Sequence, residues 1–147
     1  MRGDGEVSKA ERAARHIGAH AGKAFEDTLA YVQERKAFNQ SISQFQNTRF
    51  KLADLATELE MCRALFEKYM VKFAEGAMTV EDAARIKLCC TEMQLKMVNE
   101  CLQFHGGYGY TDEYPISRFY RDARIQTIYA GTSEIMKEVI ARELVGR

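Results

Sequence analysis

The sequence contains one proline, no tryptophan and no net charge, because 21 lysines and arginines balance 21 aspartates and glutamates. A chain without excess positive charge gives no sign of a nucleic-acid or other polyanionic partner. No apolar run approaches the ~18 residues that a membrane-spanning helix needs. The first residues, MRGDGEVSKAER, lack the apolar core of a signal peptide. We therefore expect no membrane span, no nucleic-acid partner and no targeting segment.

Metal-ligand patterns are also missing. None of the four cysteines, Cys62, Cys89, Cys90 and Cys101, belongs to a CxxC pair, and all fall inside helical patterns. We interpret them as reduced core cysteines of an intracellular protein rather than a redox or metal site. Two of the three histidines, His16 and His20, are four residues apart and share a helix face, a spacing that can hold a metal. No third ligand is visible nearby, so we predict no metal site.

The residues that are abundant predict one all-helical domain. The chain has 147 residues, of which 46% are apolar and 29% charged, enough for a buried core and a solvated surface. Alanine, glutamate, lysine, leucine and methionine favour helices. We predict an all-α, up-down four-helix-type bundle with short C-terminal helices, formed by residues 8–147 after a disordered lead at 1–7.

Three long helices are predicted from capping signals and from apolar residues at helical spacing. Capping boxes are expected at Ser8–Glu11, Ser43–Gln46 and Thr79–Asp82. The helices that follow them should end near Arg35, Gly76 and Phe104. Their buried positions should be Ile17, Ala21, Phe25, Leu29 and Val32 in the first, Leu52, Leu55, Leu59, Cys62, Phe66, Tyr69 and Phe73 in the second, and Ile86, Cys90, Met93, Met97, Cys101 and Phe104 in the third.

The stretch from Cys101 to Arg147 carries the functional signal. Gly106 and Gly107 should end the third helix, because glycine reaches positive φ without a Cβ penalty. A short basic helix and a last helix should follow, the latter capped by Thr132 or Ser133 with Glu134 in its first turn. Exposed N–H groups at such a helix start suit an anionic ligand.

Motifs in this stretch, and one upstream, carry a resemblance to a known family. They are QFHGGYGY at 103–110, EYP at 113–115, RDARI at 121–125, YAGTSEI at 129–135 and ERKAF at 34–38. In this order they resemble the C-terminal helical domain of FAD-dependent acyl-CoA dehydrogenases. The resemblance covers roughly residues 25–147. The N-terminal helical domain and middle β-domain of such enzymes are not matched, and we expect this chain to lack them.

In that family the domain holds part of FAD, completes the acyl-CoA site and forms subunit interfaces. The resemblance implies that Arg35 reaches the flavin pyrophosphate of a neighbouring subunit and that Phe38 lies against the adenosine portion. A guanidinium suits the first role, because it binds phosphate oxygens with two hydrogen bonds. The further residues implied are Gln46, Gln103, Gly107, Thr132 and Glu134 at the cofactor, and Tyr129 and Gly131 at the substrate. Three of these residues also have a purely structural explanation. Arg35 suits a helix C-terminus, Gln46 suits a helix cap, and Gln103 suits an exposed surface.

The resemblance leaves the catalytic base unassigned. Many members place a glutamate between the tyrosine and glycine that match Tyr129 and Gly131, but this chain has Ala130, which cannot accept a proton. A second branch, including long-chain and isovaleryl enzymes, places the base near the start of the first helix. Counting back from Arg35 without gaps places that base near Lys9, and Glu11 is two residues away. Glu11 is therefore a weak candidate that also fits a helix cap.

We expect the C-terminal domain of an acyl-CoA dehydrogenase of the second branch, contributing to an FAD site and a homodimer or homotetramer. It should be inactive as this chain alone. By resemblance its partners would be acyl-CoA and an electron acceptor, in the bacterial cytoplasm or the mitochondrial matrix. The alternative is a non-catalytic helical bundle, natural or a truncated or engineered fragment, that acts through self-association or partner binding.

Overall fold

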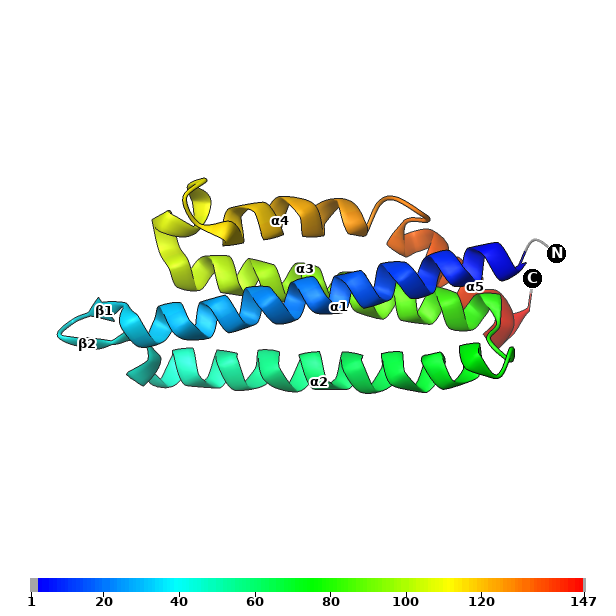
Figure 1. Cartoon of the computed structure of the whole chain (residues 1–147), viewed down its shortest axis with the longest axis horizontal. Coiled ribbons are helices and arrows are strands. Elements are labelled where there is room, and N and C mark those ends of the chain that lie inside the picture. Colours follow the sequence, from blue (N-terminus) through cyan, green and yellow to red (C-terminus); the bar gives the residue numbers. More distant parts are fainter. Residues whose placement is uncertain (1–2, 147) are drawn as a thin grey trace.

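Four helices run up and down along the long axis of the molecule (Figure 1). They are α1 (Gly3–Glu34), α2 (Gln46–Ala74), α3 (Val80–His105) and α4 (Pro115–Gln126). The fifth, α5 (Ser133–Val145), lies at the end of the bundle where α1 begins. This computed structural model describes the backbone of residues 3–146 and the side chains of residues 16–146. The predicted all-α, up-down bundle is confirmed.

The core lies between α1, α2, α3 and α4, with the most extensive interface between the parallel helices α1 and α3. The apolar positions predicted for α1 and α3 are buried or half-buried. In α2 the stripe is buried at Leu55, Leu59, Cys62 and Tyr69, but Phe73 is exposed. Phe73 belongs to the last turn of α2, where the helix is about to leave the bundle at Gly76.

Side-chain capping explains where α3 and α5 begin. Thr79 Oγ1 accepts a hydrogen bond from the Asp82 amide at 3.1 Å, and the Asp82 carboxylate accepts one from the Thr79 amide at 3.2 Å. This pair confirms the capping box predicted for α3. Thr132 caps α5 by accepting from the Ile135 amide at 3.3 Å, as one of the two predicted choices.

The capping box predicted at Ser43–Gln46 is wrong. Ser41 is the capping residue: its Oγ accepts a hydrogen bond from the Ser43 amide at 3.3 Å, at the start of the 3-10 helix η1 (Ile42–Gln44). Helix α2 then begins after Phe45, which has no side-chain cap. Ser43 cannot cap α2, because the tight turn of η1 already contains it.

Helix α1 begins at Gly3, ahead of the start that the Ser8–Glu11 capping box predicts. The side chains of Ser8 and Glu11 lie outside the described set. The division into a lead at 1–7 and a bundle at 8–147 stays a prediction.

Between α1 and α2 the chain forms a small antiparallel hairpin of β1 (Lys36–Ala37) and β2 (Gln40–Ser41). The hairpin projects beyond the end of the bundle (Figure 1). At the same end α3 continues into the 3-10 helix η2 (Gly106–Tyr110). Across the described part of the chain, no helix combines the length and apolarity needed to cross a membrane.

Candidate functional site

The tip of the hairpin is a turn of two residues, Phe38 and Asn39, both with positive φ (51° and 64°). A tight hairpin turn of this kind favours Asn-Gly, because a side chain at positive φ clashes with its own backbone. Phe38 occupies one of these two strained positions and is 90% exposed. Among the residues whose side chains are described, the one aromatic ring paired with it is that of Phe45, with the two centroids 6.2 Å apart. The hairpin therefore holds an apolar ring outward, away from the core.

Arg35 connects the hairpin to the glycine-rich turn after α3. Its guanidinium carbon lies over the Tyr108 ring, 5.5 Å from the centroid, and its carbonyl accepts a hydrogen bond from the Ile42 amide at 2.9 Å. No acidic partner of Arg35 occurs among the described residues. The exposed guanidinium is thus held on a rigid base and is available to an anion from outside the chain.

We call this end of the bundle the hairpin-end surface. It consists of the residues that the resemblance implies for the adenosine and pyrophosphate part of the cofactor, all of them exposed: Arg35, Phe38, Gln46, Gln103 and Gly107. The elements that carry them, the hairpin, the start of α2 and the end of α3, meet at one end of the molecule (Figure 1). The structure brings together five residues that are up to 72 positions apart in the sequence.

His105 fixes the glycine-rich turn, and the sequence did not single it out. Its Nδ1–H donates to the Cys101 carbonyl at 2.8 Å, and its ring stacks on Tyr31 with centroids 4.1 Å apart. Burial lowers the pKa of His105, which keeps the ring neutral. Gly109 allows the turn to pack closely, because a Cβ at this position would lie only 2.7 Å from the Leu102 carbonyl oxygen. The turn is therefore tightly packed beneath Arg35.

The other implied residues, Tyr129, Gly131, Thr132 and Glu134, lie around the start of α5. Together with Ala130 we call them the α5-end surface. Ala130 (φ 55°) and Gly131 (φ 98°) both adopt positive φ. The Glu134 carboxyl has a lowered pKa, because hydrogen bonds from its own amide and from Thr132 stabilise the charged form. Ala130 offers only a methyl group, which cannot accept a proton.

Lys87 anchors this loop from α3. Its ammonium group is buried, with 5% of the residue exposed, and donates a hydrogen bond to the Gly131 carbonyl at 2.6 Å. Burial lowers the pKa of Lys87, while Glu92 and Glu134 oppose that effect. A lysine in a helix ordinarily indicates a solvated face, so Lys87 could not be recognised from the sequence alone.

A polar pocket of about 330 Å³ opens beside this loop. Its lining includes Arg124, Thr132, Ser133 and Glu134. Arg124 donates to Thr127 Oγ1 at 2.6 Å, and Ser133 donates to the Glu92 carboxylate. The lining also includes Glu92, so the pocket has one arginine and two carboxylates. It can therefore form hydrogen bonds with both anionic and cationic groups.

The two surfaces are far apart. Lys87, beside Gly131, and Gln103 are separated by 16 positions on α3, which corresponds to roughly 24 Å along the helix axis at 1.5 Å per residue. Glu11 lies in the first third of α1, and its side chain is outside the described set. The structure thus divides the implied residues into two groups.

His16 and His20 lie side by side in α1, with ring centroids 4.4 Å apart, and His20 contacts Phe119 edge-on. Burial lowers the pKa of His20, and the neighbouring His16 adds to this. Within residues 16–146, no group of three or more potential ligands could hold a metal ion.

Comparison with known proteins places this architecture in a family context. Residues 7–145 match the family model described as acyl-CoA dehydrogenase, C-terminal domain. The mitochondrial long-chain specific acyl-CoA dehydrogenase of Sus scrofa is 43% identical over 121 residues, which are 82% of this chain and 28% of that protein. The chain therefore spans less than a third of that relative's length.

Solved structures give the same result. The butyryl-CoA dehydrogenase of Megasphaera elsdenii is 34% identical with a TM-score of 0.91, over 95% of this chain and 37% of that one. A glutaryl-CoA dehydrogenase of Mycobacterium smegmatis, solved in complex with FADH2, is 29% identical with a TM-score of 0.88. That match covers 94% of this chain and 36% of the other.

Proposed function

Because the chain belongs to the acyl-CoA dehydrogenase family, as its C-terminal domain, we propose that it supplies part of an FAD site and an oligomer interface of such an enzyme. The reaction would be the α,β-dehydrogenation of an acyl-CoA thioester. When bound, FAD would accept a hydride from the acyl β-carbon, and a protein base would take the α-proton. We assign the chain to the branch that includes long-chain and isovaleryl enzymes, because Ala130 replaces the glutamate.

The observation that carries the proposal is the exposed Phe38 at the tip of a strained hairpin. A phenylalanine at φ 51° with 90% exposure has both a backbone cost and a hydrophobic cost in the isolated chain. Burial against a flat aromatic ligand would offset both costs. Arg35 is close by, and its fork of N–H donors fits phosphate oxygens. Together these groups match the chemistry of an adenosine diphosphate moiety.

The distance between the two surfaces supports a site shared between subunits. We propose that the hairpin-end surface contacts the FAD of a neighbouring subunit, while the α5-end surface borders the substrate and FAD of its own subunit. In this arrangement Tyr129 and Gly131 line the substrate, and Thr132 and Glu134 lie near the cofactor. Each chain would then serve two cofactors.

Exposed apolar side chains support the oligomer. Large apolar residues are exposed along α2 and around α5, a distribution typical of a surface that another chain covers. They include Phe50, Met61, Val71, Ile128, Ile135, Leu144 and Val145. The alternative, a non-catalytic bundle that acts by self-association, shares this surface but gives no role to Arg35 and Phe38.

The further partners we propose are an acyl-CoA thioester and an electron acceptor. The relatives include a mitochondrial protein and bacterial ones, which supports either the mitochondrial matrix or the bacterial cytoplasm as the location.

A chimaera tests the proposal. Residues 7–145 would replace the matching domain of the M. elsdenii butyryl-CoA dehydrogenase, and the purified protein would be analysed for flavin content and mass in solution. We expect an oligomer that co-purifies with FAD. A folded chimaera that assembles but contains no FAD would contradict the proposed cofactor role, and a folded monomer would contradict the proposed interface.

A further inference from the structure

Three cysteines meet where α2 packs on α3. Cys62 Sγ lies 3.3 Å from Cys90 Sγ, and both side chains are buried. Cys89, next to Cys90, is half-buried and also forms a hydrogen bond with Cys62. All the cysteines are free thiols. Neither the hairpin-end surface nor the α5-end surface includes these sulfurs, so the proposed function leaves them unused.

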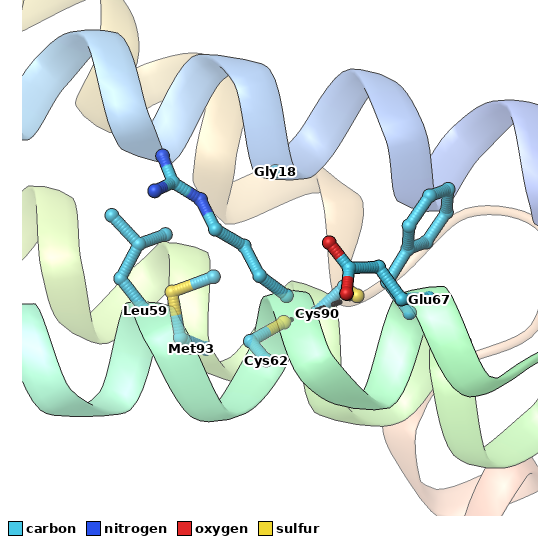
Figure 2. Close-up of a pocket in the computed structure, with 8 residues that line it drawn as sticks. Gly18, Leu59, Cys62, Glu67, Cys90 and Met93 are labelled. Carbon is cyan, nitrogen blue, oxygen red and sulfur yellow. Dashed lines mark hydrogen bonds between the residues drawn. The ribbon is translucent and has the colours of Figure 1, made fainter.

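The thiol pair borders a small pocket (Figure 2). The pocket holds about 160 Å³ and is lined by Gly18 of α1 and by side chains of α2 and α3, including both Cys62 and Cys90. The exposed residues Arg63 and Glu67 complete its wall. Because one water occupies ~30 Å³ of liquid, the pocket can admit a molecule as small as hydrogen peroxide.

The two sulfurs are in direct contact but are not bonded. A disulfide has a sulfur–sulfur bond of ~2.0 Å, so the pair must approach by about 1.3 Å. We expect rotation of the two side chains to supply this movement. Cys101 offers a contrast: it is fully buried in the same helix, and the partner of its thiol is Thr28 rather than another sulfur.

We propose that Cys62 and Cys90 form a peroxide-reactive dithiol site that closes to a disulfide between α2 and α3. In the first step one thiol loses its proton, the resulting thiolate attacks a peroxide oxygen, and the O–O bond breaks to give a sulfenic acid and a hydroxide ion, which takes up that proton to become water. In the second step the other thiol attacks the sulfenic sulfur, the S–S bond forms, and water leaves. Two thiols and one hydrogen peroxide thus give one disulfide and two waters.

The reaction should be slow near neutral pH. The hydrogen bond with Cys89 lowers the pKa of Cys62, but the hydrogen bond with Cys90 and burial outweigh it and raise the pKa to about 12. Since the thiolate is the nucleophile, little of the pair is reactive at any moment. An excess of peroxide and a time course are therefore part of the test.

The experiment treats the purified 147-residue chain with hydrogen peroxide, blocks the remaining thiols, and digests the product with trypsin without reduction. We expect two of the four thiols to be lost and the peptide of residues 52–63 to be linked to that of residues 88–96. Fragmentation of the linked pair should place the bond at Cys90. The oxidised chain should also melt several degrees above the reduced chain, because the bond closes the loop between the two helices.

Variants show whether the pairing is specific. Cys89→Ser and the control Cys101→Ser should still form the link, whereas Cys62→Ser and Cys90→Ser should lose it. A bond from Cys62 to Cys89, a bond between Cys89 and Cys90, links between chains only, or over-oxidised thiols without a link would overturn the proposal. Because the peptide map of the unmodified sequence decides among these outcomes, the test does not depend on every variant folding.

Discussion

The ammonium group of Lys87 donates a hydrogen bond at 2.6 Å to the carbonyl of Gly131, and so joins α3 to the loop before α5. Gly131 and its neighbour Ala130 both have positive φ. Such a backbone persists only where surrounding contacts determine it. We infer that Lys87 is one of these contacts, and that the shape of the loop which contains Tyr129 and Thr132 depends on it.

Lys87→Met should therefore loosen this loop. The variant leaves the Gly131 carbonyl without its donor, a change worth ~1–3 kcal/mol of unfolding free energy. Hydrogen exchange should become faster at the amides of residues 127–135 and stay unchanged in the middle of α1. Lys96→Met is the matched control, because Lys96 is an exposed lysine of the same helix whose partner is Glu58. Equal exchange rates in both variants would show that Lys87 does not hold the loop.

The same residue gives a pH dependence with a defined sign. Burial lowers the pKa of Lys87 below 10.5, so folding disfavours the charged form. The free energy of unfolding should therefore rise as the pH increases from that lowered pKa towards 10.5, because the folded chain loses the unfavourable buried charge in this range. Lys87→Met should remove this part of the pH profile.

Leu59→Asp should destabilise the fold severely. Leu59 is only 5% exposed and belongs to the core cluster with Leu55 and Cys62. An unpaired carboxylate at this position costs several kcal/mol or more, which is comparable to the whole stability of a small domain. Ala56→Asp, which adds the same charge at an exposed position of α2, is the control. Melting temperatures within a few degrees of each other for the two variants would refute the buried stripe.

The sequence was sufficient for the helices because their signals are local. Thr79–Asp82 and Thr132 are caps whose partners lie within three residues, and the stripes of α1 and α3 repeat at helical spacing. The hairpin was not predictable, since Phe38 and Asn39 adopt a turn that normally calls for glycine. Lys87 was missed for a different reason: its burial depends on a loop that is 44 residues away.

The motifs located the residues of the candidate site but not their grouping. Arg35 and Gln103 are far apart in the sequence, and only the packing of α1 on α3 brings their ends together. The contact between Arg35 and Tyr108 likewise depends on the folded turn after α3. Distances of this kind are tertiary information that one sequence does not contain.

The chain should form a homodimer or homotetramer at micromolar concentration, by symmetric helix packing. Sedimentation across a concentration series would measure its mass against the 16.8 kDa of one chain. Met61→Glu should shift the equilibrium towards the monomer, because the Met61 side chain is 66% exposed on α2. A monomer at every accessible concentration would argue against an interface in this domain.

On its own the 147-residue chain should bind FAD weakly or not at all and oxidise no acyl-CoA. The hairpin-end and α5-end surfaces each offer only part of a site, and catalysis gains several kcal/mol only when the reactants are held together. The assay mixes the chain with FAD, straight and branched acyl-CoAs and an artificial electron acceptor. Turnover above the protein-free control that disappears in Glu11→Gln would contradict this prediction and identify Glu11 as the base.

The central claim is that Arg35 presents its guanidinium to FAD, and the dissociation constant of FAD in the chimaera tests it most directly. Arg35→Ala should weaken binding at least ~10-fold, since a charge-assisted hydrogen bond contributes ~1.5–3 kcal/mol. Lys36→Ala, which removes the neighbouring exposed charge on β1, should leave the constant within about twofold of the parent. If Arg35→Ala bound FAD as tightly as Lys36→Ala, the hairpin-end surface would not be a cofactor site.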